Sequence, residues 1–153
     1  MKELLLMSHV AFGMGCILTT VWLFVDVLNA RAENLGRIRW MSRAAAAFMW
    51  LAFLAGGYWY VVDYSADKAM ILRGPWPFAH SLFMETKEHF VITLLLLATY
   101  LPIAAANDLA VNRGARRLVL CVAGLMLVLG LMAEGNGGVI SLGVKMGLLG
   151  QLH

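Results

Sequence analysis

Four long apolar runs constrain the fold of this chain more than any other feature. Residues 4–25 and 44–62 contain no charged side chain, residues 90–106 are apolar or neutral, and residues 118–133 form a fourth apolar run. A helix that crosses the hydrocarbon core of a bilayer needs about 20 such residues, within a range of roughly 17–25. The sequence therefore predicts four membrane spans, at about 4–28, 43–63, 86–106 and 116–134.

The composition excludes a water-soluble domain. Of the 153 residues, 61% are apolar and 14% are charged, whereas soluble domains are roughly 45–50% apolar and about 25% charged. In lipid every backbone amide needs an internal partner, so spans are helices or closed barrels. Barrel strands alternate apolar and polar residues, and these runs do not. We expect one integral membrane domain over residues 1–153, an all-α, four-helix transmembrane bundle in contact with the lipid bilayer.

The arginines predict the orientation of this bundle. They cluster in the first and third connectors, as Arg31, Arg37, Arg39, Arg43, Arg113, Arg116 and Arg117. Positively charged connectors stay in the cytoplasm, so we expect both termini, the loop 64–85 and the tail 135–153 to be external, on a cell inner (cytoplasmic) membrane. The net charge of +3 lies mainly in these connectors and not on a basic stripe, which argues against nucleic-acid binding.

Prolines and glycines predict where the regular structure is interrupted. Pro75 and Pro77 surround a tryptophan in the external loop, a pattern that favours a stiff turn on the membrane surface. Pro102 predicts a kink or an end near the inner end of the third helix. Three glycines within residues 135–138 predict a flexible break after the fourth span. The remaining tail is too short to cross the bilayer, so we expect it at the interface or packed on the bundle.

Two histidines give the strongest indication of a functional site. His9 lies early in the first run and His89 early in the third, and these two spans cross the membrane in the same direction. The two imidazoles are therefore expected at a similar depth in the outer leaflet. Ionisable side chains inside a span usually serve a function. We expect His9 and His89 to clamp a metal ion or the iron of a haem b.

Other residues complete this expected cofactor site. Gly13 lies one turn from His9 on the same helix face and leaves room for a flat ring. Lys87 and Arg73 are external cations expected to meet haem propionates. Glu85, four residues before His89, is expected to orient that imidazole.

Alternatives remain open for the same polar residues. His80, in the external loop, is a less favoured metal ligand, and with Glu85, His89 and Glu134 it would form a mononuclear metal site. The terminal His153 is expected to have no role. Cys16 and Cys121 lie in different apolar runs and predict apolar filler, not a disulfide. An interfacial histidine such as His9 can also serve only to hydrogen-bond a neighbour.

The pattern resembles a superfamily of four-span membrane proteins that includes the copper-resistance D domain and the HemJ-type protoporphyrinogen oxidase. The resemblance lies in the four spans, in His9 between Ser8 and Val10, and in Lys87 at the head of the third span. In the HemJ-type group a first-helix histidine and a third-helix lysine are associated with haem and activity, and His9 and Lys87 are the matching positions. That lysine usually follows a His-Ala pair, whereas here it follows Glu85 and Thr86.

The tail gives a second resemblance. The stretch 137–144, with its Gly-Gly start and Gly-Val end, is similar to the tail of an uncharacterised family of predicted four-span haem-type membrane proteins. The paired-histidine signature of that family is missing at His9.

Three functions are compatible with these patterns. The first is a haem b-binding membrane protein, or small membrane subunit, that transfers electrons near the outer face, with a quinone or a redox protein as partner. The second is a cofactor-free accessory subunit that packs in a larger membrane complex or homo-oligomer. The third, implied by the resemblance, is porphyrinogen oxidation of the HemJ type, which would make the protein an oxidoreductase component.

Overall fold

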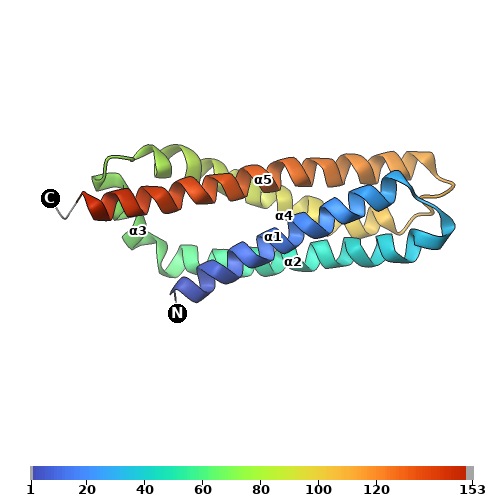
Figure 1. Cartoon of the computed structure of the whole chain (residues 1–153), viewed down its shortest axis with the longest axis horizontal. Coiled ribbons are helices and arrows are strands. Elements are labelled where there is room, and N and C mark those ends of the chain that lie inside the picture. Colours follow the sequence, from blue (N-terminus) through green and yellow to red (C-terminus); the bar gives the residue numbers. More distant parts are fainter. Residues whose placement is uncertain (1, 151–153) are drawn as a thin grey trace.

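The computed structural model describes residues 2–150 and is an all-α bundle, as the sequence predicts (Figure 1). Its elements are α1 (Lys2–Leu28), the short helix η1 (Ala32–Asn34), α2 (Leu35–Val62), α3 (Tyr64–Arg73), the π-helix η2 (Ala79–Met84), α4 (Glu85–Ala105) and α5 (Arg113–Leu149). The segments Lys2–Leu28, Ala32–Val62, Ala79–Ala105 and Arg113–Leu149 are each long and apolar enough to cross a membrane. These helices are those expected of a multi-pass membrane protein.

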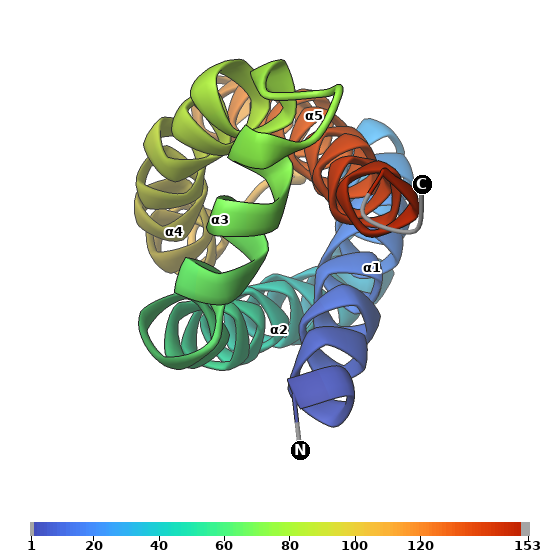
Figure 2. The same cartoon turned by 90° about the vertical axis from the view of Figure 1, so that its left-hand side faces the viewer.

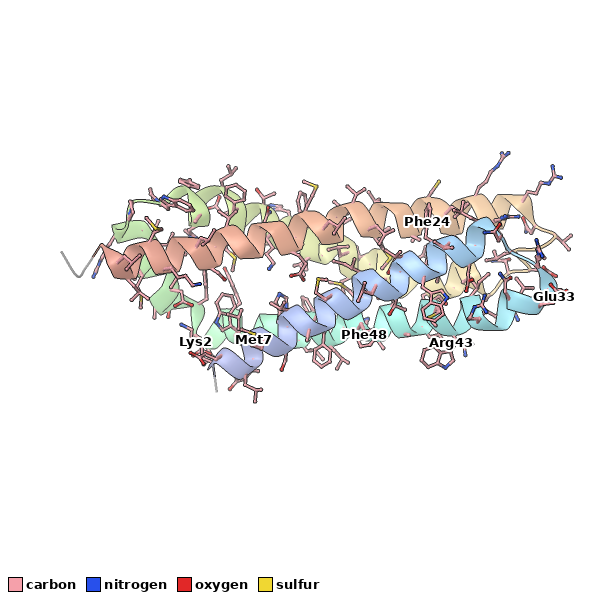
Figure 3. All side chains as sticks on the ribbon, viewed as in Figure 1. Lys2, Met7, Phe24, Glu33, Arg43 and Phe48 are labelled. Carbon is pink, nitrogen blue, oxygen red and sulfur yellow. The ribbon has the colours of Figure 1, made fainter. Side chains whose placement is uncertain are left out.

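The two ends of the bundle differ. The connectors between α1 and α2 and between α4 and α5 meet at one end, which we term the arginine end. Helix α3 lies across the opposite end, the α3 end (Figure 2). Glu33 marks the first end and Lys2 the second in Figure 3.

Helix α5 is longer than predicted. The expected flexible break at residues 135–138 is wrong, because α5 continues through these glycines to Leu149 as a helix of 37 residues. At 1.5 Å per residue it is about 55 Å long, well beyond the roughly 30 Å of a hydrocarbon core. Glycine weakens an isolated helix in water. Here, however, Gly137 leaves room for the end of Lys87, and Gly143 and Gly147 let η2 and α3 pack closely on α5, so the helix is held by tertiary contacts.

The loop 64–85 is mostly helical rather than a surface turn. The predicted turn is confined to residues 74–78, and α3 and η2 occupy most of the rest. A small core at this end contains Tyr64, Ile71, Ala79, Met84 and Ile140. The helix backbones also touch, because a Cβ atom at Gly147 would lie 2.5 Å from the carbonyl oxygen of Met70. Helix α3 is therefore fixed on α5.

Arginine side chains hold the arginine end together. Arg37 donates two hydrogen bonds to the carboxylate of Asp26, at 2.6 and 2.7 Å. Arg116 donates to the carbonyl oxygens of Val27 and Leu28, at the end of α1. Cations favour the negative end of the helix dipole, so the residues that predict topology also stabilise a helix terminus. Pro102 lies inside α4, which ends at Ala105.

The main core lies between the four long helices and is uneven along α1. Its fully buried side chains include Leu23, Ile38, Leu101 and Val119. In α1, however, the buried residues begin only at Cys16. The second half of this helix is thus well packed, whereas its first half has no fully buried residue.

Candidate functional site

A cavity of about 640 Å³ lies between the helices toward the α3 end. This volume is within the roughly 300–1,000 Å³ typical of small-molecule sites. Its walls are largely apolar, formed by residues such as Leu6, Phe53, Val91, Ile92, Ile140 and Val144. Polar side chains reach it from three of the long helices, chiefly His9 from α1, Lys87 from α4 and Lys145 from α5. Such a cavity suits a largely apolar ligand with a few polar groups.

The imidazole of His9 is held in a defined orientation. Its Nδ1 atom lies 2.8 Å from the carbonyl oxygen of Ala52 on α2. A carbonyl only accepts, so Nδ1 must carry the proton, and in the neutral ring Nε2 then has a free lone pair. Histidines that bind metals are commonly oriented by such a bond from the other ring nitrogen. His9 is thus prepared to donate Nε2 to a metal in the cavity.

A glycine on α2 makes room for this imidazole. A Cβ atom at Gly56 would lie 2.5 Å from Nδ1 and 2.7 Å from Cε1 of His9. A Cβ atom at the neighbouring Gly57 would meet nothing within 4 Å. The close approach of α1 and α2 at this level therefore depends on Gly56 in particular.

Lys87 and Glu134 form the charged part of the site. The ammonium group of Lys87 lies against α5, where a Cβ atom at Gly137 would be 2.9 Å from Nζ. Glu134 is within Coulombic reach of Lys87. The ion pairs within residues 2–150 are Lys2 with Asp67 and Arg37 with Asp26, so Lys87 has no carboxylate at contact distance. Its charge is available to an anionic group in the cavity.

Gly13 does not have the predicted role. The space beside it is filled by the carboxylate of Glu134, because a Cβ atom at Gly13 would collide with Oε1 of that residue. Gly13 therefore leaves room for a side chain of α5 and not for a flat ring. Gly56 of α2 leaves room for the imidazole of His9 itself.

The structure does not bring His89 to His9. His89 is exposed, does not line the cavity, and its Nδ1 lies 2.7 Å from the carbonyl oxygen of Glu85 on its own helix. The reason is helical phase. Residues two apart on an α-helix point about 200° from each other, and Lys87 faces the cavity. His89 must therefore face outward, and a clamp between His9 and His89 is not formed.

The remaining predicted ligands also lie away from the cavity. The side chains of Glu85 and Arg73 are exposed and do not line it. His80 is buried, and its Nδ1 lies 2.9 Å from the hydroxyl oxygen of Tyr64. Burial raises the pKa of Tyr64, so the phenol stays neutral and links α3 to η2. His153 lies outside the described residues.

The alternative of a mononuclear metal site has no support from this arrangement. Between residues 2 and 150, no group of three or more His, Cys, Asp or Glu side chains is placed to hold a metal ion. The site instead offers the imidazole of His9 and largely apolar walls. Its charged lining residues are Lys2, Glu3, Asp67, Lys87, Glu88 and Lys145. Comparisons of the chain with protein-family models, with curated proteins and with solved structures gave no match.

Proposed function

We propose that this protein binds haem b in the cavity, with His9 as the axial ligand, and serves a redox function near the outer face of the membrane. The observation that carries the proposal is the Nδ1 contact of His9 with the Ala52 carbonyl, at 2.8 Å, inside a cavity of about 640 Å³. It leaves Nε2 available in an apolar site. Haem, when bound, supplies a one-electron couple whose potential depends on its axial ligand and surroundings.

The residues of the cavity fit such a ligand. The apolar walls suit the face of a tetrapyrrole, and Gly56 supports the imidazole without obstructing it. Lys87 has no carboxylate at contact distance among the described residues, so it is suited to hold a propionate by a charge-assisted bond. Arg73 lies outside the cavity and is not part of this proposal.

One histidine at the site changes the expected spectrum. A clamp of two imidazoles gives a low-spin iron, but His89 faces away from the cavity. We therefore expect a spectrum that differs from that of a haem held by two histidines, because His9 would be the one histidine of the cavity able to hold the group.

Charge supports the placement of the cavity at the outer face. Seven of the eight arginines belong to the opposite end of the bundle, the exception being Arg73 at the end of α3. Of these seven, only Arg37 pairs with Asp26. The positive-inside rule puts that end in the cytoplasm. An inner membrane with external termini is the arrangement that we propose.

Porphyrinogen oxidation is a second candidate, and one observation favours it. His9 and Lys87, the positions that match the HemJ-type residues, come from different helices and line the same cavity. An imidazole and an ammonium group in one cavity suit a tetrapyrrole substrate with carboxylate side chains as well as a resident haem. Both candidates bind a tetrapyrrole in the cavity, but only the second one oxidises it as a substrate.

An absorption spectrum of the detergent-solubilised protein tests the proposal. We expect a reduced-minus-oxidised haem b signal and close to one haem per chain by the pyridine haemochrome method. Oxidation of added protoporphyrinogen by the same sample would select the second candidate. A colourless protein that also fails to bind added haemin would overturn both and favour a packing subunit without a cofactor.

Two glycines of α2 provide a matched pair of variants. Gly56→Ala places a methyl group 2.5 Å from Nδ1 of His9, so the imidazole must move and its bond to Ala52 is lost. Loss of the group that orients a metal ligand typically costs about 10–100-fold in affinity. We expect haemin titration to give a dissociation constant raised by about that factor. Gly36→Ala, at a position that meets nothing within 4 Å and does not line the cavity, should bind like the unchanged protein. Equal behaviour of both variants contradicts the assigned role of His9.

A further inference from the structure

We infer that the ligand of this cavity is exchanged with the lipid of the adjoining leaflet, through the side of the bundle between the first half of α1 and the last part of α5. The protein would then accept and release a membrane-dissolved tetrapyrrole, rather than hold it permanently. The inference rests on the proposed function, because it concerns the traffic of the same ligand. Four features of the structure support it.

First, α1 and α5 pack together only along part of their length. Glu134 fills the space beside Gly13, and Ile17 packs closely beside Gly130, where a Cβ atom would lie 3.3 Å away. Beyond Gly13, toward the α3 end, both helices contribute to the cavity wall, α1 through residues such as Leu6 and α5 through residues such as Val144. The ribbons of α1 and α5 diverge in this region (Figure 1).

Second, the α1 side of this opening is the more weakly held wall. The buried residues of α1 begin at Cys16, so roughly the first half of the helix has only half-buried and exposed side chains. Segments with few buried apolar contacts open locally at a lower free-energy cost than the core. The first half of α1 is therefore the part of the cavity wall that can move.

Third, the end of the bundle is closed by a better-fixed wall. Helix α3 buries Tyr64 and Ile71 and touches α5 at backbone distance through Gly147. The buried contact of Tyr64 with His80 adds a hydrogen bond at 2.9 Å. Exchange past α3 would have to break these contacts. Exchange between α1 and α5 leaves these contacts intact, and it leads into lipid, where a tetrapyrrole with a large apolar face dissolves.

Fourth, one ion pair ties the start of α1 to the fixed wall. Lys2 Nζ lies 2.6 Å from Oδ1 of Asp67 on α3, and both residues line the cavity. Asp67 is buried, whereas the side chain of Lys2 is 43% exposed. Within the described residues, this is the ion pair that links α1 to α3. It restrains the movable wall, and its loss should speed exchange.

Haem transfer from reconstituted protein measures this route. The haem-loaded protein is placed in phosphatidylcholine vesicles, and the release of haem to excess apomyoglobin is followed by absorption. We expect Lys2→Gln to release haem about two- to fivefold faster, the range that a partly exposed ion pair allows. Lys68→Gln removes an exposed ammonium group of α3 that does not line the cavity and makes no ion pair within the described residues. It is the control and should leave the rate unchanged. The charge-exchanged variant Lys2→Asp with Asp67→Lys should restore the original rate.

A cross-link across the opening gives the decisive result. In a protein with Cys16 and Cys121 replaced by alanine, Leu6→Cys and Val144→Cys are joined by a short bis-maleimide after haem is loaded. We expect haem release to slow at least about tenfold relative to the two single-cysteine variants treated with the same reagent. An unchanged rate with the haem spectrum intact overturns lateral exchange but leaves haem binding standing. Absence of a haem spectrum before cross-linking overturns the proposed function itself.

Discussion

His9→Ala is expected to remove the haem spectrum from the purified protein, while His89→Ala leaves it intact. The first change deletes the imidazole that faces the cavity and is oriented by Ala52. The second deletes an exposed imidazole that bonds to the carbonyl of its own helix. We expect the affinity for haemin to fall at least about 100-fold in His9→Ala. Haemin titration and pyridine haemochrome analysis of both variants measure the difference.

Imidazole in solution separates ligation from a purely structural role of His9. The alanine variant leaves a gap next to Gly56, and free imidazole at millimolar concentration should occupy it and restore a Soret band. A variant that is merely misfolded would not respond. Retention of the full spectrum by His9→Ala, or its loss in His89→Ala, would show that the ligand has been misidentified.

The difference between these two histidines also shows what the sequence can predict. The depth of both residues in the membrane follows from their positions in the apolar runs. Their direction around the helix does not, because runs that are apolar all round carry no periodic signal. In α4 the stretch from Phe90 onward gives no amphipathic face that would fix which of Lys87 and His89 points inward. Only the packing of α4 against α5 decides it.

The fold was more predictable than the site for the same physical reason. Length and apolarity predict four helices able to cross a membrane, and residues 2–150 contain four such helices. The end of α5 was missed because the glycines at 135, 137 and 138 were interpreted as they would be in water. In the bundle, Gly137 receives the end of Lys87 and Gly147 receives the backbone of α3. Small residues at regular spacing, such as Gly143 and Gly147, indicate a contact between helices. This signal is present in the sequence.

The role of Glu134 could be inferred only from the structure. In the sequence it ends the fourth apolar run and serves as a boundary. In the fold α5 continues, so the carboxylate lies within the bundle, beside Gly13 and near Lys87. Lys87, which is within Coulombic reach of this carboxylate, is far away in sequence, and no local pattern connects the two. Long-range charge interactions of this kind depend on which helices become neighbours.

Two glycines of α5 should respond in opposite directions to the same substitution. Gly138→Ala places a methyl group where nothing lies within 4 Å, and alanine is favoured over glycine in a helix by roughly 0.5–1 kcal/mol. This variant should be slightly more stable. Gly147→Ala places a methyl group 2.5 Å from the oxygen and 3.0 Å from the carbonyl carbon of Met70. Those atoms belong to the backbone of α3 and cannot rotate away.

The α3 end must therefore separate in Gly147→Ala, and overpacking of this kind costs about 1–3 kcal/mol. A chain of this size loses about 2–4 °C of Tm for each kcal/mol. Thermal unfolding of both variants in detergent, followed by circular dichroism, should show a lower Tm for Gly147→Ala and an equal or higher Tm for Gly138→Ala. Because Gly147 does not line the cavity, haem binding by this variant at low temperature should persist. Equal Tm values for the two variants would mean that α3 is not seated on α5 at Gly147, and the rigid wall on which lateral exchange depends would be lost with it.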